Sequence, residues 1–257
     1  MKKQEQIAME FITSCSFKDD ICAVFLTGSF AFSNADEFSD IDLFIILNDN
    51  VKYRERGNKR IDGMLIEYFA NPMRQAEKYI DDNYSKVALH EVNMILGGAV
   101  IFNKHSAAEK AIAYCKQKLA HEFKAMSEFS IKSGLYSLWD SYDEMRRAFL
   151  KQTHDMQMHF FGFIRSAFEL YSRYIKSPVP GYHKLYRWLT DDDYCRRYGL
   201  PVYNDFEFLE KMRAAFTAEC NDYEAMMGLT EDVYGYTLEK MGGFDIDNFV
   251  LRGVLDL

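Results

Sequence analysis

Two aspartates and an upstream Gly-Ser pair are the strongest candidates for a binding or catalytic site in this sequence. Asp40 and Asp42 stand two apart at the start of the apolar run 43–47. In a strand, alternate side chains point to the same face, so both carboxylates would lie on one side. Like charges this close repel each other and need a cation, and hard oxygen ligands on a rigid element suit Mg²⁺ bound together with phosphates.

The Gly28-Ser29 pair follows the apolar segment 21–26, which predicts a strand that leads into a turn. Glycine has no Cβ and lets the backbone approach a phosphate, and the Ser29 hydroxyl can hydrogen-bond that phosphate. A strand, a glycine turn and two aligned aspartates together predict a site for a metal ion and a phosphorylated substrate.

The order Gly-Ser, ten intervening residues and Asp-x-Asp resembles the DNA polymerase beta-like nucleotidyltransferase superfamily. Within it the chain is similar to the minimal and the antibiotic-modifying nucleotidyltransferases, such as the aminoglycoside and lincosamide enzymes, which carry a C-terminal helical domain. Family members require a third carboxylate on a neighbouring strand. Glu67, in the centre of the apolar segment 64–70, takes that place by pattern.

The resemblance implies transfer of a nucleoside monophosphate from a nucleoside triphosphate to a hydroxyl of a small acceptor, with release of pyrophosphate. The resemblance favours ATP as the nucleoside triphosphate and AMP as the transferred group. Two Mg²⁺ ions would be held by Asp40, Asp42 and Glu67, and Gly28 and Ser29 would position the terminal phosphates. The acceptor could be an aminoglycoside, a lincosamide, another small alcohol or amine, or a protein side chain, and no sequence feature distinguishes these possibilities. In some relatives the active site is completed by a second subunit of a dimer, so a homodimer is a possible assembly for this chain.

The resemblance also implies a general base for the acceptor hydroxyl. Some family members use a carboxylate for this role. Glu67 is one candidate, and the acids Asp140, Asp143 and Glu144 of the helical region are others. Acids on amphipathic helices are usually solvated, so each of these three has that simpler interpretation.

The segment 178–189 resembles a proline-then-lysine stretch in the helical domain of several relatives. By that resemblance Lys184 would face the triphosphate, and Tyr182 would contact the base or the sugar. The alternative is that the prolines end one helix and that Lys184 is a solvated residue of the next.

The periodicity of apolar residues predicts an α+β domain in 1–104 and an all-α bundle in 105–257. The resemblance implies that the first is the nucleotidyltransferase domain and that the bundle binds the acceptor. The first domain should hold a small mixed sheet with flanking helices. Strands are expected at 21–27, 40–47, 58–62, 64–70 and 97–103, and helices at 4–16 and 71–83, the latter with Asn71 as N-cap. The Asp62-Gly63 pair predicts a hairpin turn. Helical apolar stripes occupy 108–129, 135–149, 160–174 and 208–223.

Composition limits the choice of partner. The chain has 257 residues and a formal net charge of -8. Proteins that grip a nucleic-acid backbone usually carry a basic face, so a nucleic-acid partner is disfavoured and a small or cationic acceptor is favoured. No apolar stretch is long enough for a membrane span and no secretory signal is visible, so we expect a cytoplasmic protein. Five cysteines without C-x-x-C spacing indicate reduced thiols.

Two other functions fit parts of the sequence. Arg147 and His154 match the loose R-x(4–6)-H pattern of HEPN ribonucleases, which are toxins often partnered with minimal nucleotidyltransferases. This alternative is an RNase or a toxin-antitoxin regulatory module. The other alternative is a catalytically silent nucleotide-binding protein. A second Asp-x-Asp, at Asp245 and Asp247, has no Gly-Ser and no strand beside it, and we interpret it as a solvated turn.

Overall fold

The computed structural model describes residues 3–32, 35–198, 202–219 and 221–253. The chain divides into two compact units. The first unit comprises Met1–Phe123 and Asp193–Leu200, and the second comprises Lys124–Asp192 and Pro201–Leu257.

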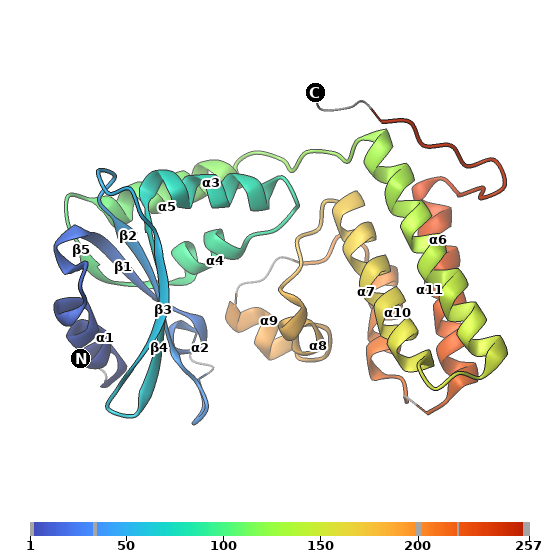
Figure 1. The fold of residues 1–257 in the computed structure, drawn as a ribbon, viewed down its shortest axis with the longest axis horizontal. Helices are drawn as coiled ribbons and strands as arrows, with labels where there is room; N and C mark the ends of the chain where they lie inside the picture. The colour runs from blue at the N-terminus through green and yellow to red at the C-terminus, as the bar shows by residue number, and fades with distance from the viewer. Residues whose placement is uncertain (1–2, 33–34, 199–201, 220, 254–257) are drawn as a thin grey trace. The chain divides into compact units, whose positions relative to one another are not determined.

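A five-stranded mixed sheet in the order β3-β4-β2-β1-β5 is the centre of the first unit. Strands β2 and β4 are parallel, whereas the other neighbouring pairs are antiparallel. The strands are β1 (Ile21–Thr27), β2 (Ile41–Leu47), β3 (Glu55–Ile61), β4 (Met64–Pro72) and β5 (Ala99–Asn103). Helices cover both faces of this sheet (Figure 1).

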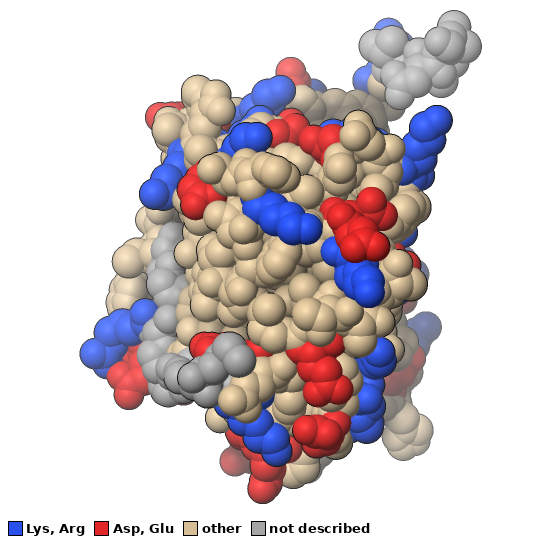
Figure 2. Space-filling model, turned by 90° about the vertical axis from the view of Figure 1, so that its left-hand side faces the viewer, with Lys and Arg blue, Asp and Glu red and all other residues tan. Residues whose placement is uncertain are grey.

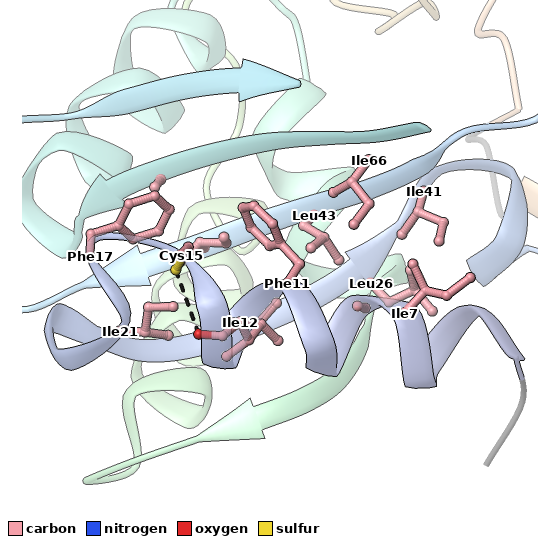
Figure 3. Close-up of a cluster of buried hydrophobic side chains, with 14 of the residues drawn as sticks. Ile7, Phe11, Ile12, Cys15, Phe17, Ile21, Leu26, Ile41, Leu43 and Ile66 are labelled. Carbon is pink, nitrogen blue, oxygen red and sulfur yellow. Dashed lines mark hydrogen bonds between the residues drawn. The ribbon is translucent and has the colours of Figure 1, made fainter. Parts of the chain in front are cut away.

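Helix α1 (Lys3–Ser14) covers one face of the sheet. Its Ile7, Phe11 and Ile12 pack on strand residues that include Leu43 and Ile66, and all five are buried (Figure 3). Each such side chain contributes about 1.5–3 kcal/mol when fully buried. A short helical turn η1 (Lys18–Asp20) links this helix to β1.

The opposite face is covered by α3 (Met73–Tyr84), α4 (His90–Gly97) and α5 (Ala107–Leu119) (Figure 1). Alternation along β2 divides its residues between the two faces: Leu43 and Ile45 face α1, whereas Phe44 and Ile46 face these three helices. The strand is therefore apolar on both faces, as expected for an interior strand covered by helices on both sides.

The second unit consists mainly of helices α6 (Glu128–Lys151), α7 (Met156–Tyr174), α8 (Tyr182–Thr190), α10 (Phe206–Thr217) and α11 (Tyr223–Met241). Helices α6, α7, α10 and α11 pack against one another as a bundle. Helix α9 (Asp192–Tyr198) belongs mostly to the first unit. The predicted fold class, a mixed α+β domain followed by an all-α domain, is confirmed.

Several predicted boundaries differ from the structure. The proposed domain boundary at residue 104 precedes α5, but Ala108, Ala111 and Cys115 of that helix are buried in the sheet core, which places it in the first unit. The N-cap prediction for Asn71 is wrong, because β4 continues through Pro72 and α3 begins at Met73.

Two predicted helical stripes are interrupted. The stripe at 108–129 divides where α5 ends at Leu119 and α6 begins at Glu128, with Ser127 as N-cap. The stripe at 208–223 divides between α10 and α11, where Asp222 caps the second helix by accepting from the Ala225 amide. Cys220, predicted within that stripe, lies outside the described residues. Both α6 and α11 begin at a residue whose side chain accepts a hydrogen bond from a backbone amide of the first turn, and such a new start does not show in the apolar spacing.

Charged side chains of both signs are interspersed on the face of the molecule shown in Figure 2. Lys and Arg alternate there with Asp and Glu, and the described residues form no broad basic surface on that face. This distribution fits the negative net charge. No described helix combines the length and apolar character that a membrane span requires.

Candidate metal and nucleotide site

Three carboxylates from two neighbouring strands converge in the first unit. Asp40 immediately precedes β2, Asp42 is its second residue, and Glu67 lies in β4. Asp42 and Glu67 are direct partners in the parallel β2–β4 pair. One ligand oxygen from each of the three residues lies within 4.8 Å of the others, and all three residues are half-buried.

The strand register explains this convergence. Asp42 and Phe44 share a face of β2, while Glu67 shares a face of β4 with Phe69. The aromatic residues are covered by the helices of that face, but the acids lie nearer the start of β2, where access to solvent remains. Because partly buried like charges repel strongly at such separations, the arrangement favours a bound cation.

Arg56 of β3 contacts this cluster, and the sequence analysis did not identify it. Its Nη2 donates to Glu67 Oε1 at 2.8 Å, and its guanidinium carbon lies 4.3 Å from the centroid of the Phe69 ring. The side chains of Arg56 and Glu67 are 68% and 26% exposed, so the ion pair contributes at most about 1 kcal/mol. Arg56 therefore offsets part of the negative charge without neutralising the site.

Gly28 has a steric reason to be glycine. Its φ is +66°, and a Cβ built there would lie 1.9 Å from Asp42 Oδ2. The preceding Thr27 is the register partner of Asp42 across the β1–β2 pair. The turn after β1 and the Asp42 carboxylate thus occupy adjoining space, which any larger residue at position 28 would invade.

Ser29 follows directly in the short helix α2 (Gly28–Ala31) and is half-buried. The Thr27 hydroxyl, one residue before the glycine, is buried and has no hydrogen-bond partner among the described residues. The Gly-Ser pair predicted to hold phosphates is therefore adjacent to the acidic cluster, as the spacing in the sequence suggested.

The donor set fits a hard divalent cation. All three candidate ligands are carboxylates, and oxygen ligands of this kind suit Mg²⁺ or Mn²⁺ better than the softer metals that prefer sulfur or imidazole. Asp40, Asp42 and Glu67 would hold such an ion. The Asp42 carboxylate can lie beside residue 28 because glycine has no Cβ there. The described residues contain no other group of this kind.

The other predicted contacts lie in the second unit. Lys184 is in α8, where its backbone amide donates to Gly181 O, and its role at the triphosphate stays a prediction. The side chain of Tyr182 lies outside the described part of the structure.

Of the candidate bases in α6, Asp143 is poorly suited to accept a proton. Its side chain is 8% exposed and bonds Arg146 at 2.8 Å and Arg147 at 2.6 Å. The hydrogen bond from Arg146, together with the charges of both arginines, lowers the pKa of this carboxyl. A carboxylate held in this way is a structural ion-pair partner. Asp140 and Glu144 lie on the same helix.

The structure gives little support to the ribonuclease pattern. Arg147 is in α6, which ends at Lys151, and it pairs with Asp143. His154 lies in the turn that follows, so the two residues do not share a helix. The second Asp-x-Asp forms a turn, in which Asp245 accepts a hydrogen bond from the Asp247 amide.

Comparison with known proteins finds a family match over part of the chain. Residues 8–93 match a family described as "Nucleotidyltransferase domain". A solved nucleotidyltransferase-like protein from Exiguobacterium sibiricum 255-15 is 11% identical, with a TM-score of 0.47 over 93% of this chain and 77% of that one. No curated protein matches the chain. The segment that holds Gly28, Asp40, Asp42 and Glu67 thus carries the sequence pattern of a nucleotidyltransferase domain.

Proposed function

We propose that the protein transfers a nucleoside monophosphate from a nucleoside triphosphate to a hydroxyl group of a small acceptor. The observation that carries this proposal is the convergence of Asp40, Asp42 and Glu67 within 4.8 Å, inside the segment that matches the nucleotidyltransferase family. Neither part suffices alone, because exposed acidic groups are common and a family match does not ensure an intact site.

The chemistry is a displacement at the α-phosphorus. The acceptor oxygen forms a new bond to phosphorus, and the bond to the bridging oxygen breaks. Pyrophosphate leaves with that electron pair, and the hydroxyl proton passes to a base. We take Glu67 as the candidate for this base, since it belongs to the carboxylate cluster and to the same unit as Asp42.

In this proposal the carboxylates hold the metal ions and the Gly-Ser pair holds the phosphates. Asp40, Asp42 and Glu67 would hold two Mg²⁺ ions, which supply charge neutralisation to the triphosphate and acidify the acceptor hydroxyl when bound. The Gly28-Ser29 turn would donate hydrogen bonds to the outgoing phosphates. Lys184, if brought to the same phosphates, would add a positive charge.

The nucleotide is proposed to be ATP and the transferred group AMP. The acceptor is proposed to be a small molecule, since the net charge of -8 opposes a polyanionic one. An antibiotic alcohol is included in this class. The alternative, a catalytically silent nucleotide-binding protein, predicts nucleotide binding without turnover. A turnover assay therefore distinguishes it from the transferase.

The test is nucleotide transfer to a panel of hydroxylated acceptors that includes kanamycin and lincomycin. Products carrying the monophosphate are identified by mass spectrometry, and pyrophosphate is quantified in parallel. We expect Mg²⁺-dependent pyrophosphate release with the native chain and none with Asp42→Asn. Asp245→Asn is the matched control, because it removes a carboxylate from an Asp-x-Asp outside the site. Release that survives Asp42→Asn contradicts the proposal.

A further inference from the structure

A cavity lies beside the carboxylate cluster, and Arg56 both lines this cavity and contacts Glu67. It has a volume of about 540 Å³, which lies in the range of sites for small molecules. Strands β2, β3 and β4 supply one side and helices α3 and α4 the other, all within the first unit. The lining residues used below are Phe44, Arg54, Arg56, Phe69, Tyr79 and Met94.

Arg56 joins this cavity to the carboxylates. The same guanidinium that lies 4.3 Å from the ring centroid of Phe69, which lines the cavity, donates to Glu67 Oε1 at 2.8 Å. A ligand seated against Phe69 is therefore separated from the cluster by a single side chain.

The cavity is lined by two arginines, Arg54 and Arg56, and two glutamates, Glu55 and Glu91. The carboxylate of Glu55 accepts a hydrogen bond at 2.7 Å from Tyr68, which packs in the core beneath α1 on the other face. Glu91, the remaining acid, accepts from Asn83 Nδ2 at 2.5 Å. Because Arg56 is paired with Glu67, Arg54 is the guanidinium of the cavity that has no ion pair among the described residues.

Aromatic rings form much of the remaining wall. Phe44 and Phe69 come from the sheet and Tyr79 from α3. The Arg54 guanidinium carbon lies 5.6 Å from the centroid of the Tyr79 ring, so both arginines are laid along aromatic surfaces. Guanidinium groups held in this way present planar donors to carboxylate or phosphate, while ring faces favour a flat ligand.

We propose that this cavity binds the acceptor, and that the acceptor is an alcohol with a flat ring and an anionic group. The ring would lie among Phe44, Phe69 and Tyr79, the anionic group beside Arg54, and the hydroxyl towards Glu67. This inference rests on the proposed transferase function, and it assigns to the first unit the acceptor recognition that the sequence placed in the helical domain. A polycationic aminoglycoside does not fit such a cavity.

Four probes share one benzene ring and one hydroxymethyl group and differ in the substituent opposite the hydroxymethyl group, which is anionic in two of them, neutral in one and cationic in one. They are 4-(hydroxymethyl)benzoate, 4-(hydroxymethyl)phenyl phosphate, the neutral 4-(hydroxymethyl)benzamide and the cationic 4-(hydroxymethyl)benzylamine. Binding to the full chain is measured by ligand-observed NMR or calorimetry without nucleotide, so the result does not depend on turnover. The carboxylate and the phosphate compounds distinguish the two sources of anionic charge.

Matched variants locate the binding. Met94→Trp fills the cavity from α4, and Asn93→Trp adds the same bulk at the exposed neighbouring position outside the lining. Arg54→Met removes one cavity cation, and Lys78→Met removes one exposed cation from α3. Circular dichroism and thermal unfolding of all four variants verify that each is folded.

We expect an anionic probe to bind at least tenfold more tightly than the amide and the amine. Met94→Trp should abolish this binding and Arg54→Met should weaken it about tenfold, whereas both controls should bind as the native chain does. Equal binding of the four probes, tighter binding of the amine, no binding of any probe, or binding that survives Met94→Trp overturns the proposal. Mn²⁺ binding to the carboxylate cluster tests the transferase function separately.

Discussion

Replacing Gly28 by alanine should damage the metal site through a single methyl group. The added Cβ would lie 1.9 Å from Asp42 Oδ2, whereas ordinary contact begins at 3.4 Å, so the carboxylate must retreat by about 1.5 Å. Metal ligands tolerate displacements of roughly 0.2 Å. We therefore expect Gly28→Ala to weaken Mn²⁺ binding by at least about tenfold, as disturbance of a ligand's surroundings commonly does.

The backbone contributes a second effect that must be separated from the first. At φ +66°, an alanine is strained by about 1–2 kcal/mol. Gly63 has a similar φ of +79°, but a Cβ there meets nothing within 4 Å. Gly63→Ala is therefore a matched control that adds the strain without the collision.

The assay is a titration with Mn²⁺ followed by electron paramagnetic resonance, together with urea unfolding of each variant. Both variants should lose about 1–2 kcal/mol of unfolding free energy from backbone strain. Only Gly28→Ala should lose Mn²⁺ affinity. If Gly28→Ala binds Mn²⁺ as tightly as Gly63→Ala does, the reasoning about the shared space of the turn and Asp42 is refuted.

Three further predictions concern the same unit. Asp42→Asn should abolish Mn²⁺ binding while leaving urea unfolding unchanged or slightly shifted towards higher stability, because it removes a repelling charge; a large loss of stability would contradict this. Arg56→Met should tighten Mn²⁺ binding several-fold, since the arginine competes for Glu67; weaker binding in calorimetry would count against that competition. Burial and, second, the hydrogen bond to Glu55 raise the pKa of Tyr68 to about 12. The contribution of the protonated Tyr68 hydroxyl to the free energy of unfolding should therefore be complete below pH 10 and be lost between pH 10 and 12. Tyr68→Phe should flatten that decline in urea unfolding at pH 9 and 11, and an identical decline in both proteins would refute it.

The sequence predicts the core of the first unit because its signals are local. The run 43–47 is apolar on both faces and thus indicates a central strand, and the Asp62-Gly63 pair indicates a turn. Both residues of that turn have positive φ, 48° and 79°, and β3 and β4 pair directly across it. Local geometry of this kind depends on few residues.

Arg56 could have been found by the same means. A two-residue turn at Asp62-Gly63 fixes the register of the hairpin, which sets Asn58 opposite Glu67 and Arg56 opposite Phe69. Side chains opposite each other in an antiparallel pair share a face, so Arg56 lies two register positions from Glu67 and on the same face of the sheet. Arg56 belongs to no catalytic motif, so finding it from the sequence requires the register of the β3–β4 hairpin.

The place of α5 could not be predicted from periodicity. Its stripe of apolar residues shows that one face is buried, but spacing does not say against which partner. Ala108 and Ala111 are small, which allows the helix to approach the sheet closely, and packing of this kind is decided by the whole fold. The acidic cluster differs, because strand pairing alone brings Asp42 beside Glu67.

The most direct test of the central claim is a crystal of the chain grown with Mn²⁺ and a non-hydrolysable ATP analogue, examined by anomalous diffraction. We expect manganese peaks coordinated by Asp40, Asp42 and Glu67, with the analogue's phosphates beside Gly28 and Ser29. Manganese bound elsewhere, or nucleotide bound without any ion at these three carboxylates, would contradict the account.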